Sequence, residues 1–290
     1  MRSAIPDAEL EAVRRQGFGV AYRMLGSVGD AEDVAQEAVL RYTRADEPIR
    51  EPGAWITTAA TRLSIDVLRS ARARRETYVG PWLPEPLIET TADGPASQVE
   101  MAESLSQAFL VMLERLTPVE RAAFLLREVF GYEYAEIAEV VVRSEENARQ
   151  LVARAKKHLG GSAPRFDPDE ALRAELLDRF LAAAEDGDVE GLERLLAEDA
   201  ALYSDGGGKV TAARKPLFGA ARIAQVVATV TRKQQRRGPF VAERVTVNGQ
   251  PGRILRAGDG RIWDVLTIDV VDGRIQTVRV VRNPDKLTHV

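Results

Sequence analysis

The feature that most constrains the fold is a change in the spacing of apolar residues at Gly160-Gly161-Ser162-Ala163-Pro164. Before this break, apolar residues recur every three or four positions, which is the period of a helix packed on one face. After it, a helix near 169–184 and a shorter one near 189–197 precede segments in which apolar and polar residues alternate. Alternation is typical of half-buried strands. We therefore expect an all-α part followed by a separate α+β domain.

The alternating segments of the second part predict a curved antiparallel sheet. Asp259-Gly260 and Asp272-Gly273 stand between consecutive segments, and an Asp-Gly pair is a strong hairpin signal because glycine accepts positive φ. The expected strands cover residues 241–247, 252–257, 262–271 and 274–282.

The helical part is divided by a proline-rich stretch. Residues 6–75 have helical spacing, with Asp30 as an expected N-cap and a helix from Ala54 to about Arg72. Four prolines between 81 and 95 then predict a linker. Helices are expected again from about Gln98 to Leu159. The sequence thus predicts four parts, namely residues 1–76, a linker at 77–97, residues 98–160, and residues 165–290.

Composition excludes several classes of protein. The chain of 290 residues has no cysteine and two histidines, which removes disulfides, thiolate nucleophiles and cysteine- or histidine-rich metal sites. It has no apolar run of membrane-spanning length and its first residues lack the apolar core of a signal peptide, so we expect a cytoplasmic protein. We expect no cofactor and no metal. The net charge of −4 predicts weak DNA binding by the chain alone.

Residues 135–154 have the pattern of a helix-turn-helix. Two short helical segments are separated by a few residues, and Ser144 is placed to cap the second. Arginine and amide side chains on the second helix can read base edges through paired hydrogen bonds. The candidate DNA contacts are Arg143, Asn147, Arg149, Gln150 and Arg154. A plain helical hairpin with solvated charges is the alternative, and Val142 at the turn, where glycine is usual, counts against DNA binding.

A second basic segment lies at the end of the first helical region. Arg62, Asp66 and Arg69 share one helix face by their spacing, and Arg72 continues into an arginine run that suits a DNA backbone. The alternative is a solvated helix end with an internal Asp–Arg pair. Trp55 begins this helix, and we expect it to be a core anchor more readily than a base-stacking residue.

An acidic turn precedes both basic segments, in the stretch Asp30-Ala31-Glu32-Asp33-Val34-Ala35-Gln36-Glu37. It can dock a basic partner helix, but taken alone it is better explained by simple capping of a surface helix. In order, this stretch, the helix ending DVLRSARARR and the segment LTPVERAAFLLREVFGYEYAEIA resemble an extracytoplasmic-function sigma factor over residues 6–160. The resemblance implies that Asp30, Asp33, Gln36 and Glu37 contact the β′ clamp helices of core RNA polymerase. It also implies that the Trp-led helix and the loop before it melt and read the −10 promoter element, while the helix-turn-helix reads the −35 element.

Three further motifs resemble those of one subgroup, which fuses a SnoaL-like domain to the sigma factor. This resemblance implies a cone-shaped α+β domain that contacts the sigma module and regulates it without a separate anti-sigma protein. Many sigma factors have asparagine where this chain has Arg62, which leaves the −10 preference open. The motifs are Trp82-Leu83-Pro84-Glu85-Pro86 in the linker, Asp205-Gly206-Gly207-Gly208-Lys209, and Asn283-Pro284-Asp285-Lys286-Leu287 near the C-terminus.

The DGGGK motif does not fit a phosphate-binding loop, because Lys209 is followed by Val210 where the Walker pattern has Ser or Thr. We expect a docking loop, with the apolar linker and the C-terminal motif packed nearby. Two other functions stay open. One is a stand-alone helix-turn-helix regulator whose C-terminal domain senses an unknown small ligand. The other is an enzyme with Asp264 or Asp269 as acid or base.

Overall fold

The computed structural model describes residues 5–76, 78–88, 105–160 and 169–290, with the side chains of 71–76 left undescribed. The chain forms two compact units. The first comprises Met1–Thr77 and Leu110–Ala163, and the second comprises Tyr78–Phe109 and Pro164–Val290. The described part of the expected linker, residues 78–88, therefore belongs to the second unit, together with the C-terminal domain.

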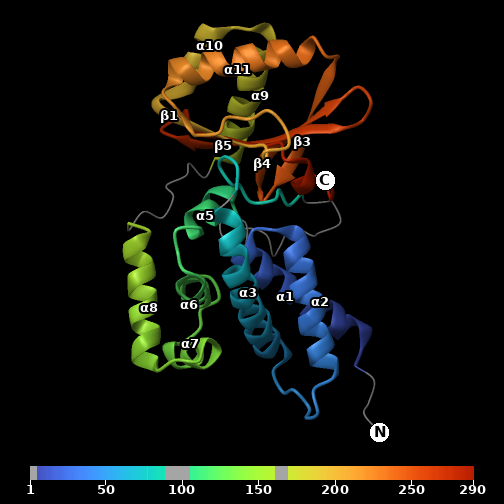
Figure 1. Ribbon diagram of the computed structural model, residues 1–290, viewed down its shortest axis with the longest axis vertical. Coiled ribbons are helices and arrows are strands. Elements are labelled where there is room, and N and C mark those ends of the chain that lie inside the picture. The colour runs from blue at the N-terminus through green and yellow to red at the C-terminus, as the bar shows by residue number, and fades with distance from the viewer. Residues whose placement is uncertain (1–4, 77, 89–104, 161–168) are drawn as a thin grey trace. The chain divides into compact units, whose positions relative to one another are not determined.

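The first unit begins with three helices that lie side by side (Figure 1). They are α1 (Asp7–Leu25), α2 (Val28–Thr43) and α3 (Pro52–Glu76). Val13, Ala38, Tyr42 and Ile56 are buried between them. The N-cap of α2 is Ser27, whose hydroxyl accepts from the Asp30 amide, so the expectation that Asp30 is the cap was wrong. The helix begins one turn earlier because serine is an equally good cap and precedes it.

The next helices in the described part of the chain are α5 (Gln107–Leu113), of which the first residues belong to the second unit, and α6 (Pro118–Glu128), α7 (Tyr134–Val141) and α8 (Glu145–His158) of the first unit. Thr117 and Glu120 form a complete capping box at the start of α6, with proline at the first helical position. Ser144 caps α8 through its hydroxyl, as the sequence predicts. The helix start expected near Gln98 falls within residues 89–104, which lie outside the described part of the chain.

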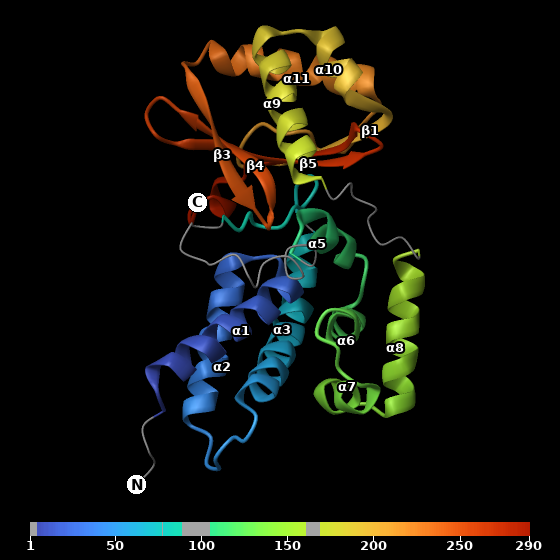
Figure 2. The ribbon, with the colours of Figure 1, turned by 180° about the vertical axis from the view of Figure 1, so that it is seen from behind.

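The second unit is an α+β domain with a six-stranded sheet. The helices are α9 (Glu170–Asp186), α10 (Val189–Leu195) and α11 (Ala220–Gln235). Both views show them on one face of the sheet (Figures 1 and 2). Their apolar sides and the inner face of the sheet form one core, which includes Leu177, Phe180, Ile223, Ile268 and Val278.

The sheet has the order β2-β1-β6-β5-β4-β3. Its strands are β1 (Leu196–Asp205), β2 (Leu217–Phe218), β3 (Phe240–Val247), β4 (Gln250–Ala257), β5 (Ile262–Val271) and β6 (Arg274–Val281). The four expected strands, β3 to β6, pair antiparallel as predicted. β1 was not expected as a strand, and it pairs with β6 in parallel.

The linker residues 78–88 run along the side of the sheet that faces away from the three helices (Figure 2, teal). Ile88 forms a single antiparallel bridge with Val247, the last residue of β3. A short 3-10 helix, η2 (Pro284–Lys286), follows β6 on the same side. Among the described residues, no helix is both long and apolar enough to cross a membrane.

Candidate nucleic-acid interface and linker contacts

Helices α7 and α8 form the expected helix-turn-helix. Ile137 and Ala138 of α7 are buried, as are Leu151 and Val152 of α8. The turn passes through Val142, which has φ 54° and ψ 59° in the left-handed region. Glycine is usual at such a position because a β-branched side chain is strained there. The turn therefore has the usual left-handed geometry, and valine adopts it with its side chain exposed.

The predicted DNA contacts lie on the outer surface of this motif. Asn147, Gln150 and Arg154 recur along one face of α8, opposite the buried face. Arg143 precedes the helix and donates to the carbonyl of Val142 at 2.8 Å. Arg154 lies 3.9 Å from the Glu120 carboxylate, yet its side chain remains about half exposed. The helix thus presents amide and guanidinium groups to solvent, which are the groups that read base edges in a major groove.

Arg149 is held more firmly than the other candidates. Its Nη2 lies 2.5 Å from a carboxylate oxygen of Glu145, one turn earlier in α8. Its guanidinium carbon lies 4.4 Å from the centre of the Tyr134 ring, at the start of α7. The guanidinium of Arg127, from the end of α6, lies 4.7 Å from the centre of the same ring. The sequence analysis did not identify Tyr134 or Arg127.

The loop between α2 and α3 borders an open cavity of about 700 Å³. Trp55 lines it, and this ring also packs edge-on against Tyr42 with the ring centres 5.7 Å apart. Trp55 is therefore both a core contact and part of a solvent-facing wall. The cavity is lined by Arg41, Ala45, Glu47, Pro48, Ile49, Arg50, Glu51, Ala54, Trp55, Thr58, Ala59 and Arg62.

Arg62 lines this cavity and also contacts the helix-turn-helix. Its Nε donates to the carbonyl of Val140 at 3.0 Å, and its Nη2 donates to the carbonyl of Glu139 at 2.8 Å. A guanidinium at the C-terminal end of a helix is favoured because the last carbonyls lack partners within the helix. Arg62 thus caps α7 from α3.

The other predicted DNA contacts on α3 are Arg69 and Arg72. Arg69 donates to Asp66 at 3.2 Å, so this pair has the intrahelical contact that the alternative interpretation describes. Both side chains remain exposed. The side chain of Arg72 lies outside the described residues.

The acidic residues of α2 form a solvent-facing strip. Asp30, Asp33 and Glu37 are spaced three and four residues apart and share one face of the helix. Asp33 and Gln36 are exposed, while Asp30 and Glu37 are partly exposed. Glu37 accepts from Arg41 at 2.7 Å. The strip remains available to a basic partner.

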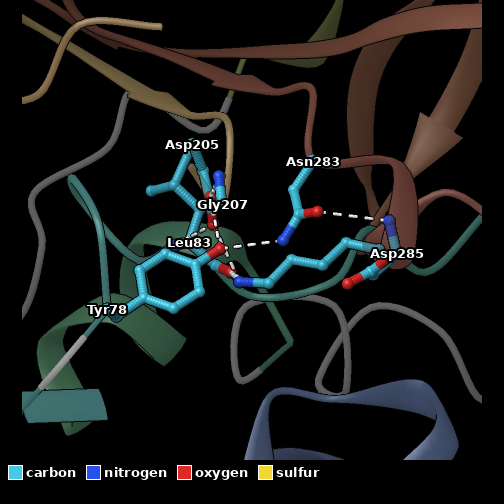
Figure 3. Close-up of polar contacts among 7 residues, drawn as sticks. Tyr78, Leu83, Asp205, Gly207, Asn283 and Asp285 are labelled. Carbon is cyan, nitrogen blue, oxygen red and sulfur yellow. Dashed lines mark hydrogen bonds and ion pairs between the residues drawn. The ribbon is translucent and has the colours of Figure 1, made fainter. Parts of the chain in front are cut away.

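The linker is fastened to the C-terminal domain by Asp205, the last residue of β1 (Figure 3). This carboxylate is fully buried. It accepts from the Tyr78 hydroxyl at 2.6 Å and from the Leu83 amide at 2.9 Å, both in the linker. It also accepts from the Gly207 amide at 3.0 Å and from the Lys286 ammonium at 2.8 Å. A buried carboxylate with four donors, one of them a cation, is fully compensated.

Lys286 joins the linker to the C-terminal motif. Its ammonium also donates to the Leu83 carbonyl, and it lies 4.2 Å from the centre of the Trp82 ring and 5.1 Å from that of Tyr78. Burial and the hydrogen bond to Asp205 raise the pKa of the Tyr78 hydroxyl. The hydroxyl therefore stays protonated and remains a donor at neutral pH.

Asn283 and Gly207 bring the other two motifs together. The Asn283 amide donates to the Tyr78 hydroxyl at 2.9 Å (Figure 3). Gly207 has φ 58°, and a Cβ added there would lie 2.3 Å from the Asn283 amide nitrogen. Only glycine fits this position. The three motifs therefore meet at one place, and at its exposed rim Lys209 donates to Asp285 at 2.6 Å.

The second half of the linker is paired with the turn between β3 and β4. Leu87 and Asn248 exchange two hydrogen bonds, from the Leu87 amide to the Asn248 side chain at 3.2 Å and from the Asn248 amide to the Leu87 carbonyl at 2.8 Å. His289 lies 3.0 Å from the carbonyl of Pro86. Residues 78–88 are thus held at both ends, and Leu83, Pro84 and Pro86 are buried.

The two carboxylates considered for catalysis are paired with arginines. Asp269 lies 2.6 Å from Arg279, with both side chains buried. Asp264 lies 2.9 Å from Arg282 and accepts from Gln234 at 3.1 Å. Burial raises the pKa of Asp264, while Arg282 and Gln234 oppose the shift. These contacts account for both residues as structural pairs within the domain.

Two family models match this chain, Sigma-70 region 2 at residues 10–74 and Sigma-70, region 4 at residues 106–159. The ECF RNA polymerase sigma factor SigJ of Mycobacterium tuberculosis is 39% identical, over 97% of this chain and 93% of that protein. This chain belongs to the extracytoplasmic-function (ECF) sigma factors. It is therefore an alternative sigma factor that serves transcription initiation.

Two further comparisons agree with this family. The crystal structure of the M. tuberculosis SigJ aligns with a TM-score of 0.78 at 34% identity and covers 98% of both chains. The ferric citrate uptake sigma factor FecI of Escherichia coli is 33% identical, over 47% of this chain and 78% of its own length. The agreement with SigJ includes the C-terminal α+β domain. The family indicates a non-catalytic transcription regulator and does not favour a stand-alone helix-turn-helix protein.

Several residues that make these contacts were not predicted from the sequence. Tyr78 stands two residues after the end of α3 and has no local pattern that marks it. Asn248 lies in a turn between two expected strands and is fully buried. Tyr134 stands in the segment GYEYAEIA at the start of α7, and Arg149 lies in α8. Because the two residues are on different helices, no spacing rule predicts their contact.

Proposed function

We propose that this sigma factor contacts core RNA polymerase through the acidic strip of α2, formed by Asp30, Asp33, Gln36 and Glu37. The strip is exposed and negatively charged, which steers a basic partner surface electrostatically. Because transcription takes place in the cytoplasm, the protein acts there.

The recognition helix α8 reads the −35 element. The observation that supports this role is the row of amide and guanidinium groups on the solvent face of a helix capped at Ser144. Arg149 and Gln150 are placed for base edges, and Arg154 for phosphate or base. Each base contact contributes about 1–3 kcal/mol of discrimination.

The cavity between α2 and α3 takes part in reading the −10 element. It is large enough for an unstacked base, it has an aromatic wall at Trp55, and it is flanked by Arg41 and Arg50. Base stacking on an aromatic side chain together with nearby cations is the usual means of holding single-stranded DNA. Arg69, whose side chain is exposed, extends the basic surface along α3, and Arg72 stays a DNA contact proposed from the sequence alone.

The C-terminal domain regulates the sigma module in cis by holding the linker between regions 2 and 4. The observation that carries this proposal is the buried contact among Asp205, Lys286 and the linker residues 78–83. The linker joins the two DNA-reading regions, so a domain that fixes the linker governs how those regions are spaced. No separate anti-sigma protein is required for such control.

In vitro transcription with core RNA polymerase tests this function. The full chain is compared with chains ending at Gly160 and at Arg282, the second of which lacks Asn283 to Val290. Promoter-dependent transcripts are expected from the full chain and from the chain ending at Gly160. The chain ending at Arg282 should differ from the full chain in transcript yield, because it lacks Lys286. Identical yields from all three would contradict regulation in cis, and no transcript from any chain would contradict the assignment of promoter contacts.

A further inference from the structure

Arg149 is a long side chain that needs a fixed direction to read a base. Its side chain is 58% exposed, and a free arginine side chain loses up to about 2 kcal/mol of conformational entropy when it is ordered. A contact that orders it before DNA arrives removes that cost from binding. The question is therefore what orders Arg149 in the unbound protein.

Two neighbours fix the guanidinium of Arg149. Glu145 takes one N–H through the 2.5 Å contact at Nη2. The Tyr134 ring lies beneath the group, with its centre 4.4 Å from the guanidinium carbon. Contact through a ring face uses none of the N–H donors, and a guanidinium has five. Donors therefore remain for the paired acceptors of a guanine edge.

Tyr134 is itself held in place from the other direction. The Arg127 guanidinium lies 4.7 Å from the centre of the same ring. Arg127 is fixed by its hydrogen bond to the Tyr132 carbonyl at 2.8 Å and by Glu133 at 3.2 Å. Each arginine that shares the ring thus has its own carboxylate, which offsets the repulsion between the two cations.

The contacts form a row that runs from α6 through the start of α7 to α8, in the order Glu133, Arg127, Tyr134, Arg149, Glu145. We propose that Tyr134 is a positioning residue for recognition of the −35 element, acting through Arg149. It does not touch DNA in this role. The inference rests on the proposed base contact of Arg149 and adds a residue of α7 as a determinant of promoter preference.

The test uses the full chain bound to core RNA polymerase and a pool of double-stranded promoter fragments randomised at the −35 and −10 positions. Sequencing of the bound fragments gives a base preference at each position for the parent and for Tyr134→Ala, Tyr134→Phe, Arg149→Ala and the double variant Tyr134→Ala/Arg149→Ala. Tyr132→Ala is the matched control, since the Tyr132 side chain is not part of the row.

Arg149→Ala should abolish the preference at one −35 position. Tyr134→Ala should reduce the preference at that same position by about two- to fivefold, the range expected for an exposed cation–ring contact. Tyr134→Phe and Tyr132→Ala should match the parent, and the double variant should match Arg149→Ala, because Tyr134 acts only through Arg149. The −10 preference should be unchanged throughout.

Three results overturn the inference. If Arg149→Ala changes the −35 preference but Tyr134→Ala does not, or if the two effects add in the double variant, Tyr134 does not position Arg149. If Arg149→Ala leaves every −35 preference unchanged, the proposed base contact fails and the positioning role fails with it. A misfolded helix-turn-helix would lower the preference at every −35 position, whereas loss of the ring contact lowers it only at the position that Arg149 reads.

Discussion

Replacing Lys286 by methionine should release the linker from the C-terminal domain. The change keeps most of the side-chain volume but removes the cation from Asp205, which is fully buried. Breaking a buried ion pair by removing one partner costs about 3–5 kcal/mol. The low end applies here, because Asp205 keeps three other donors, from Tyr78, Leu83 and Gly207. A loss of about 3 kcal/mol corresponds to a change in the docking equilibrium of about a hundredfold.

Amide hydrogen exchange measures this change directly, because the Leu83 amide is buried and donates to Asp205. In Lys286→Met, exchange in the peptide covering 78–88 should rise by about a hundredfold, while peptides from α1 and α6 exchange as in the parent. Lys209→Met is the control, since the Lys209–Asp285 pair is more than half exposed and contributes about 0–1 kcal/mol. Equal exchange rates for Leu83 in the two variants would refute the reasoning.

Three more predictions concern the first unit. Arg62→Ala should lengthen or broaden the distribution of distances between spin labels on α2 and α8, because two charge-assisted hydrogen bonds to α7 are lost. An unchanged distribution would contradict a role of Arg62 in holding α3 and α7 together. Asp30→Lys combined with Asp33→Lys should weaken binding to core polymerase and reduce its salt dependence, and unchanged affinity in a titration would exclude the α2 strip from the interface. Burial favours a raised pKa for Glu120, but hydrogen bonds from Thr117 and the charges of His158 and Arg154 lower it. Glu120→Gln should therefore cost about 1–3 kcal/mol at pH 7, and the difference in unfolding free energy from the parent should shrink as pH falls from about 4.3 through the lowered pKa; equal differences at pH 7 and pH 3 would contradict it.

Local signals in the sequence predicted the elements that depend on local interactions. The predicted cap at Ser144 marks where α8 begins, and the helix expected near 169–184 corresponds to α9. The hairpin turns between β4, β5 and β6 follow from their Asp-Gly pairs, and Asp272 has positive φ as such a turn requires. In each case a few neighbouring residues determine the conformation.

Elements that depend on distant partners were not predicted. The segment LAEDAALYSD becomes β1 because β6 pairs with it in parallel and β2 in antiparallel, and neither pairing leaves a trace in its own spacing. The helix α11 was also missed, although Ile223, Ala224 and Ala228 recur at helical spacing on its buried side. The linker contact was expected from three motifs, yet the buried pair of Asp205 and Lys286 joins residues 81 positions apart. No local pattern gives that pairing.

The contacts between regions 2 and 4 indicate that these regions can separate without leaving a buried charged side chain unpaired. Arg121 of α6 is buried and donates to the carbonyl of Met24 in the last turn of α1 at 2.7 Å, and it keeps Glu114 of its own region at 2.7 Å. Arg62 makes the reverse contact, from region 2 to the end of α7, and its side chain is already exposed.

This arrangement matters because the two promoter elements are far apart on DNA. Elements centred roughly 25 base pairs apart lie about 85 Å apart along B-form DNA. An α3 of 25 residues is about 37 Å long, and an α8 of 14 residues is about 21 Å long. While Arg62 bonds to the end of α7, the surfaces that we propose read DNA on α3 and α8 lie within the combined reach of these helices, which is less than the separation on DNA. If these surfaces read the two elements as proposed, their joint engagement on straight DNA requires the Arg62 contact to break. After such a separation Arg121 would keep its ion pair with Glu114. Arg62 would lose its hydrogen bonds to the end of α7, and a DNA phosphate could replace them.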